Sequence, residues 1–186
     1  MFANSMSSNA IPGAQSRASQ YRYCGMSIKL VVIGNGPVGH KFLEQLCESG
    51  HSGAFDISVF GEEPRAAYDR VHLTAWFESR SAEPLNMVPE GFYASHNITA
   101  HLGDKVVAID RERQIVRSQN GMEVQYDKIV LATGSYPFVP PVPGHERDNC
   151  FVYRTIEDLE AITAAAATSS SGVVIGGGLL GLEAAK

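Results

Sequence analysis

The sequence predicts an α/β fold: a Rossmann-like domain with a three-stranded β-meander, followed by the truncated start of a second Rossmann domain. Two observations predict this arrangement. Glycine motifs of the form G-x-G-x-x-G occur at 34–39 and at 176–181, each between a short apolar run and a helical pattern. A proline-rich stretch at 136–150 lies between them, as expected for a linker.

The first glycine motif follows the apolar run 30–33, which is typical of a strand buried on both faces. Gly34 permits a tight turn, Gly36 leaves room for a pyrophosphate, and Gly39 allows a close approach of helix and strand. The helix that begins near Val38 adds unpaired amides and a partial positive charge. The motif therefore predicts a dinucleotide site.

An acidic residue completes this fingerprint. The alternating run 55–60 predicts the next strand, and Glu62 follows it at a spacing suited to the ribose hydroxyls of an adenosine. The alternative is that Glu62 and Glu63 form a solvated strand end. The glycines upstream favour the binding role for Glu62.

Composition narrows the class of protein. The chain has 186 residues, 44% hydrophobic and 19% charged, which is typical of a soluble globular protein. Its net charge of −5 argues against nucleic acid and anionic membranes as partners, and no apolar run is long enough to span a bilayer. The scattered cysteines 24, 47 and 150 show no disulfide or metal-ligand spacing. We expect a reducing location, the cytoplasm, and no metal ligand in this chain.

Residues 1–25 are polar, lack a periodic apolar pattern and are predicted to be a disordered tail. The first domain is assigned to 26–135. The connector at 64–77 is either a surface loop and helix with aromatic anchors, or a segment from which Tyr68 and Arg70 reach back to the adenosine diphosphate part of a cofactor.

Short alternating runs follow the connector. After a strand at 98–102, runs at 105–110, 114–118 and 123–126 predict the meander, with an Asn-Gly turn at 120–121. The apolar run 128–133 then predicts a buried strand that ends at Gly134. Beyond the linker, 151–186 is assigned to the start of the second domain, with a helix at 156–167 and a strand at 173–175.

The second glycine motif consists of Gly176, Gly178 and Gly181, and the helix after it is predicted from Leu182. Two such sites in series indicate two dinucleotides held face to face, FAD in the first and NAD(P)H in the second. Hydride transfer between them needs only placement, so no residue is expected to act as a catalytic acid, base or nucleophile.

Four motifs carry a family resemblance: VVIGNGPVG, FGEEPRAAYDRVHLT, IVLATGSYPFVPPVPG and VVIGGGLLGLEAA. From about residue 26 to 186 the chain resembles the FAD-dependent pyridine nucleotide–disulfide oxidoreductase superfamily. Within it, the chain is most similar to the N-terminal part of large subunits of NAD(P)H-dependent assimilatory nitrite reductases.

The resemblance implies a set of cofactor contacts. The FAD contacts would come from the first turn, the ends of neighbouring strands and the connector: Gly34, Gly36, Pro37, Gly39, Glu62, Arg70, Val106, Thr133 and Gly134. Among these, Glu62 would bind the adenosine ribose, Arg70 the adenine–phosphate side, and the Val106 backbone the adenine. The NAD(P)H pyrophosphate would lie on Gly176, Gly178 and Gly181.

The resemblance also implies a path for electrons: from NAD(P)H to FAD, then to an iron–sulfur centre and a siroheme, where the full-length enzyme reduces nitrite to ammonium. A small subunit is a further implied partner. The ligands of these centres would lie beyond Lys186, so residues 1–186 alone are expected to bind FAD weakly and to lack nitrite reductase activity.

Two departures from related families bear on this assignment. Cys47 has no cysteine partner near the first glycine turn, so a redox dithiol is not expected. Leu73, Thr74 and Ala75 stand where related ferredoxin and rubredoxin reductases carry a lysine after leucine and serine. Two alternatives stay open: an NAD(P)H-dependent ferredoxin or rubredoxin reductase or NADH oxidase-like flavoprotein, and an inactive truncated nucleotide-binding fragment.

Overall fold

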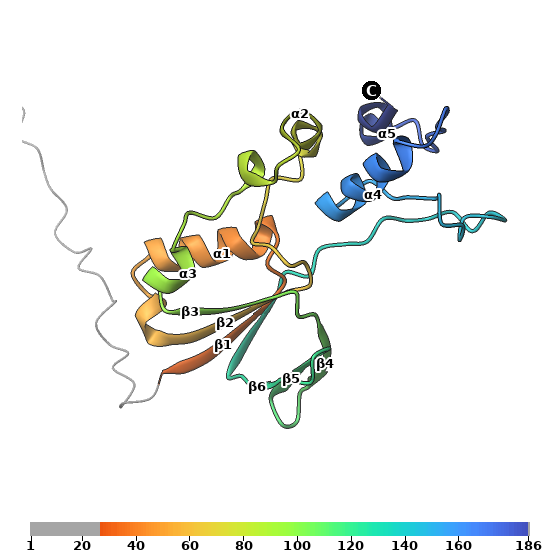
Figure 1. The fold of residues 1–186 in the computed structure, drawn as a ribbon. Coiled ribbons are helices and arrows are strands. Elements are labelled where there is room, and N and C mark those ends of the chain that lie inside the picture. Colours follow the sequence, from red (N-terminus) through yellow and green to blue (C-terminus); the bar gives the residue numbers. More distant parts are fainter. Residues whose placement is uncertain (1–26, 186) are drawn as a thin grey trace, which may run out of the picture.

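A computed structural model describes residues 27–185, and the predicted tail 1–25 lies outside them. The fold is α/β and contains a four-stranded parallel sheet and a three-stranded antiparallel meander (Figure 1), as the sequence predicts. The parallel sheet has the order β3 (Ile98–Leu102), β2 (Phe55–Gly61), β1 (Ile28–Ile33), β7 (Lys128–Leu131). The meander has the order β4 (Val106–Asp110), β5 (Ile115–Ser118), β6 (Glu123–Gln125).

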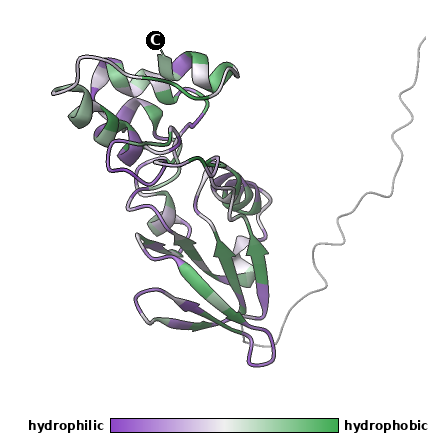
Figure 2. Ribbon diagram, turned by 90° about the vertical axis from the view of Figure 1, so that its right-hand side faces the viewer, coloured by the Kyte–Doolittle hydropathy of each residue, from purple (hydrophilic) through white to green (hydrophobic). Residues whose placement is uncertain are grey.

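Strand β1 is buried on both faces, which explains its continuous apolar sequence. Leu30 and Val32 belong to the core cluster under helix α1 (Pro37–Glu48), which also contains Leu43 of that helix. Val31 and Ile33 point the other way, into a cluster with residues of the meander. Figure 1 shows α1 above the sheet and the meander below it, and Figure 2 shows that the sheet strands are predominantly hydrophobic.

The connector between β2 and β3 is built of short helices. It covers residues 62–97 and includes the stretch 64–77. Its elements are η3 (Leu73–Ala75), α2 (Trp76–Ser79), η4 (Glu83–Leu85) and α3 (Phe92–Ser95), and η2 (Ser52–Ala54) precedes β2. A bridge between Tyr68 and Asn86 closes the connector on itself. The connector is therefore an ordered unit rather than a simple surface loop.

Helix α4 (Ile156–Ala166) packs on this connector. Ile156 and Leu159 are completely buried, in a cluster with Tyr68 and Trp76 among others. The helix begins with a capping box, in which the Thr155 hydroxyl accepts from the Asp158 amide at 3.2 Å while the Asp158 carboxylate accepts from the Thr155 amide at 2.8 Å. The predicted helix at 156–167 is confirmed.

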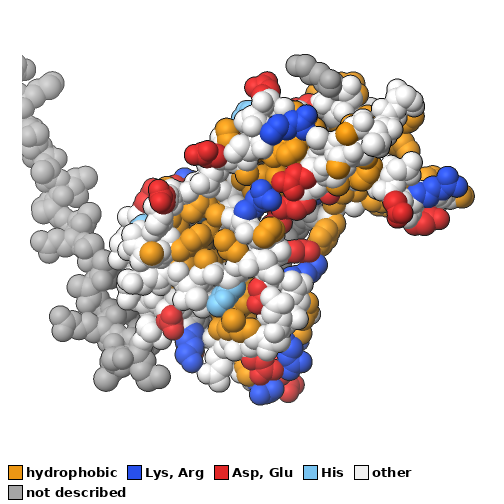
Figure 3. Space-filling view, in the orientation of Figure 1, with side chains coloured by type: hydrophobic (Ala, Val, Ile, Leu, Met, Phe, Trp, Pro, Cys, Tyr) orange, Lys and Arg blue, Asp and Glu red, His pale blue; other side chains and the backbone are white. Residues whose placement is uncertain are grey.

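Polar contacts join the same two segments. Arg65 forms an ion pair with Glu157 at 2.6 Å, and Arg80 donates to the Thr163 hydroxyl at 2.7 Å. On the face drawn in Figure 3, acidic and basic side chains lie interspersed. Among residues 27–185, no helix is both long enough and apolar enough to cross a bilayer.

The prediction of a strand at 173–175 is wrong. Val173 and Ile175 are 89% and 79% exposed, and the segment pairs with no other strand in the described part of the chain. A strand needs hydrogen bonds to a neighbouring strand, and an apolar run alone does not ensure that a neighbouring strand is present. The following helix, α5 (Leu179–Ala185), begins three residues before the predicted Leu182.

Candidate functional site

The first glycine turn is shaped by close backbone contacts. Gly34 has φ +108°, and a Cβ at this position would lie 2.1 Å from the carbonyl oxygen of Ala132. A Cβ at Gly39 would lie 2.0 Å from the Gly34 carbonyl oxygen. Gly36 has open space where its Cβ would be. The fold therefore requires the first and third glycines, whereas the second leaves the backbone accessible from outside.

Free amides line this accessible side. The first backbone bond of helix α1 runs from the His40 amide to the Gly36 carbonyl at 2.9 Å, and no side chain caps the helix. Pro37 has no N–H, and the amides of Val38 and Gly39 find no acceptor among the described residues. Unpaired amides at the start of a twelve-residue helix are suited to binding an anion.

The other predicted FAD contacts meet this turn at the carboxyl edge of the sheet. Strand β1 lies between β2 and β7, so the strand order reverses at the turn, which is the switch point where open α/β sheets bind ligands. Glu62 follows β2, and Thr133 and Gly134 follow β7. Val106, the first residue of β4, lies next to Lys105, whose ammonium contacts Glu62.

Two adjacent carboxylates follow β2, and the structure distinguishes them. The Glu62 side chain is 50% exposed, whereas that of Glu63 is 24% exposed. Glu63 accepts a hydrogen bond from the Tyr68 hydroxyl at 2.6 Å and pairs with the Arg70 guanidinium. Glu63 is thus held by the connector, and Glu62 is the carboxylate that faces the open edge.

Two residues that the sequence did not single out hold Glu62. Lys105 Nζ lies 3.0 Å from Glu62 Oε1, and the Tyr136 hydroxyl donates to Glu62 Oε2. The sequence indicates their role only weakly. Lys105 precedes Val106, and Tyr136 lies two residues after Gly134, and both Val106 and Gly134 are predicted to bind FAD. These contacts, first the Tyr136 hydrogen bond and then Lys105, lower the pKa of Glu62. The hydrogen bonds that Lys105 donates, first to the Tyr136 hydroxyl and then to Glu62, raise the pKa of Lys105.

Arg70 lies beside Glu63 and Tyr68. Its guanidinium donates to the Tyr68 hydroxyl at 2.9 Å and to the Arg154 carbonyl at 3.1 Å, in addition to its pairing with Glu63. Burial, with the Glu63 hydrogen bond, raises the pKa of Tyr68, so its hydroxyl remains a donor. Arg70 therefore links the end of β2 to the segment before α4.

Cys47 is partly buried against the core, in keeping with the predicted packing role. It lies in α1 and packs against the cluster under the sheet, and burial raises the pKa of its thiol. A raised pKa disfavours the thiolate that redox chemistry needs. Cys47 and the exposed Cys150 are both free cysteines.

The second glycine turn repeats the local geometry of the first. Gly176 has φ +127°, a Cβ at Gly181 would lie 2.0 Å from the Gly176 carbonyl oxygen, and the Leu182 amide donates to the Gly178 carbonyl at 3.0 Å. Gly178, like Gly36, has open space at its Cβ position. Within the described residues, no strand packs beside this turn.

A glycine turn at the switch point, a carboxylate after the second strand and a second glycine turn downstream define a class: α/β oxidoreductases that use two dinucleotides. The chain belongs to the pyridine nucleotide-disulphide oxidoreductase family, which it matches over residues 28–186. Membership in this family implies binding of FAD and NAD(P)H.

Two relatives are nitrite reductases. The chain is 52% identical over 158 residues to the nitrite reductase (NADH) large subunit of Escherichia coli (strain K12), covering 85% of this chain and 19% of that protein. It is 58% identical over 157 residues to the nitrite reductase [NAD(P)H] large subunit of Klebsiella oxytoca, covering 84% and 16%. The chain thus spans less than a fifth of the length of these relatives.

A solved structure resembles the fold. In the covalent putidaredoxin reductase–putidaredoxin complex, the matched chain has a TM-score of 0.74 and 32% sequence identity. The match covers 85% of this chain and 39% of that chain. The predicted fold class and family are thereby confirmed.

Proposed function

We propose that this chain is the electron-entry part of an NAD(P)H-dependent nitrite reductase and that its first domain binds FAD. The observation that carries the proposal is the open backbone at Gly36, with the free amides of Val38 and Gly39 next to it and Glu62 at the end of the adjacent strand. Amides suit a diphosphate, and a carboxylate suits the hydroxyls of a ribose.

In this proposal different residues of the chain position the adenosine, the pyrophosphate and the flavin of FAD. The Gly34–Gly39 turn binds the pyrophosphate, Glu62 binds the adenosine ribose, and the Val106 backbone lies at the adenine. The Thr133–Gly134 segment lies toward the flavin, where small side chains leave room for a flat ring. Bound FAD would supply the chemistry, as the acceptor of a hydride from NAD(P)H.

For Arg70 we propose an indirect role instead of the direct contact on the adenine–phosphate side that the resemblance implies. Its guanidinium already serves Glu63, Tyr68 and the Arg154 carbonyl. We propose that it supports the adenine–phosphate side of the site by fixing the connector, and that direct contact with a phosphate would require it to leave Glu63.

The domain boundaries belong to the same proposal. Residues 26–135 form the FAD domain, 136–150 the linker, and 151–186 the first part of the NAD(P)H domain. Gly176, Gly178 and Gly181 would receive the nicotinamide dinucleotide, because their turn has the same local geometry as the first.

The identity of the acceptor is inferred from the relatives. Both nitrite reductase large subunits share more than half of their aligned residues with this chain. Nitrite reduction, an iron–sulfur centre, a siroheme and contact with a small subunit would then belong to the longer protein. The partly buried, free Cys47 supports an exit for electrons other than a dithiol in α1.

A ferredoxin or rubredoxin reductase is the second candidate, favoured by the similarity to putidaredoxin reductase. The two candidates differ in acceptor. A protein comprising this chain and all that follows it in its gene would be assayed with NADH or NADPH and either nitrite or an artificial electron acceptor. Nitrite-dependent oxidation of either nucleotide that yields ammonium supports the proposal. Reduction of the artificial acceptor alone supports the reductase, and a protein that oxidises neither NADH nor NADPH contradicts both.

A further inference from the structure

On the basis of the proposed FAD site, we propose that Tyr136 is a latch on Glu62, the carboxylate expected to bind the ribose. A latch here means a hydrogen-bond donor that the cofactor displaces when it binds. The Tyr136 hydroxyl donates to Oε2 of Glu62, an oxygen to which a ribose hydroxyl of FAD would also donate. FAD therefore binds by displacing Tyr136, and the binding of FAD is coupled to the position of the linker.

Both oxygens of the Glu62 carboxylate are engaged. Lys105 Nζ lies 3.0 Å from Oε1, and the Tyr136 hydroxyl donates to Oε2. Lys105 also donates to the Tyr136 hydroxyl at 2.6 Å and lies 4.9 Å from the centre of its ring. A ribose that presents two neighbouring hydroxyls to this carboxylate competes with these two donors for the same two oxygens.

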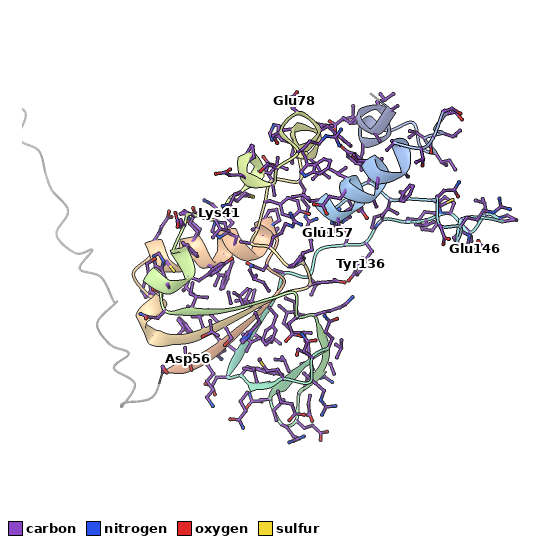
Figure 4. All side chains as sticks on the ribbon, viewed as in Figure 1. Lys41, Asp56, Glu78, Tyr136, Glu146 and Glu157 are labelled. Carbon is purple, nitrogen blue, oxygen red and sulfur yellow. The ribbon has the colours of Figure 1, made fainter. Side chains whose placement is uncertain are left out.

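Tyr136 is the group that can leave. Its side chain is 69% exposed, and it stands two residues after Gly134 in a segment without helix or strand. Figure 4 shows Tyr136 at the start of the linker, where the chain leaves the sheet. A tyrosine hydroxyl and a ribose hydroxyl are both neutral O–H donors, so one replaces the other without changing the charge at Glu62.

Lys105 is the group that stays. It immediately precedes β4, so its backbone is anchored to the meander, and its ammonium preserves the charge balance of Glu62. Near a bound dinucleotide the same ammonium also favours the diphosphate charge. Displacement of Tyr136 moves the first residues of the linker, which leads to the capped start of α4 at Thr155. The latch thus connects the ribose site to the segment that precedes the second domain.

The test compares FAD binding by the wild-type chain, Tyr136→Phe and Tyr153→Phe, followed by quenching of flavin fluorescence. Tyr136→Phe removes the competing hydroxyl and keeps the ring, so FAD should bind about fivefold more tightly. Tyr153→Phe is the matched control, because the Tyr153 hydroxyl has no hydrogen-bond partner in the described part of the chain. It should bind FAD like the wild type.

A second readout monitors the latch without FAD. Carboxyl NMR of Glu62 in the cofactor-free chain should show its pKa rising in Tyr136→Phe and unchanged in Tyr153→Phe. FAD affinity that is unchanged or weaker in Tyr136→Phe overturns the latch and leaves the FAD site intact. Failure of every variant to bind FAD, both in this chain and in the protein extended by all that follows it in its gene, contradicts the proposed function, and the latch with it.

Discussion

The Cβ position of Gly39 lies 2.0 Å from the carbonyl oxygen of Gly34. The first turn of α1 therefore rests directly on the backbone that leaves β1, and no side chain fits between them. Gly36, between these two, has no atom within 4 Å of its Cβ position. The same six-residue motif thus contains glycines required by packing and one that leaves space for a ligand.

Alanine substitutions should separate these roles. Gly39→Ala should lower the free energy of unfolding by about 2 kcal/mol or more, because backbone must move to admit the methyl group. Gly36→Ala should leave stability nearly unchanged but weaken FAD binding at least about tenfold, since its methyl group would occupy space next to the pyrophosphate. Urea unfolding and FAD titration measure the two effects. Gly53→Ala, in open space outside the motif, is the control, and equal effects at Gly36 and Gly39 would contradict the assignment.

Substitution of the two carboxylates after β2 should affect FAD affinity and the free energy of unfolding differently. Glu62→Gln should weaken FAD binding with little change in stability, because Glu62 is half exposed and serves the ribose. Glu63→Gln should instead lower the free energy of unfolding by about 1–3 kcal/mol, since it leaves Arg70 without its anion. FAD titration and urea unfolding of both variants provide the comparison. A loss of FAD affinity confined to Glu63→Gln would exchange the two roles.

Docking of α4 on the connector should depend on its buried side chains. Leu159→Ala removes a completely buried leucine and should lower the free energy of unfolding by about 2–4 kcal/mol. It should also speed hydrogen exchange of the α4 amides. Leu180→Ala, at a position 52% exposed in α5, is the control and should change little. If the two substitutions cost the same, α4 is not held by this cluster.

His40 should make stability depend on pH. Its side chain is 2% exposed, and burial lowers its pKa below the ordinary value of 6.5. The unfolded chain therefore binds more protons just below pH 6.5, so this contribution to stability is complete above pH 6.5 and is lost as pH falls toward the lowered pKa. His40→Leu should reduce the difference between urea unfolding at pH 7.5 and at pH 5.5. An undiminished difference in the variant would show that other groups cause it.

The sequence was sufficient where structure is local or strongly apolar. The run 30–33 predicts β1, because a strand covered on both faces needs apolar residues throughout, and the spacing of the first motif predicts the turn that follows. The meander at 105–126 is predicted by alternation and by the Asn-Gly turn between its last two strands.

Contacts between distant segments were not predictable in this way. Glu62 and Tyr136 are 74 positions apart, and Arg65 and Glu157 are 92 apart, so no local periodicity relates them. The packing of α4 on the connector likewise joins two segments whose patterns show only that each has an apolar face. The strand at 173–175 was predicted wrongly because apolar sequence shows the tendency to pair but not the presence of a partner.

The proposed FAD site depends on contact between a diphosphate and the free amides of the first glycine turn. The most direct test is an FAD titration of the ¹⁵N-labelled chain, followed by amide NMR. The amide resonances of Gly36, Val38 and Gly39 should shift together with increasing FAD, and these shifts should be lost in Gly36→Ala. If FAD binds and these three resonances stay in place while others move, the dinucleotide lies elsewhere and the central claim is contradicted.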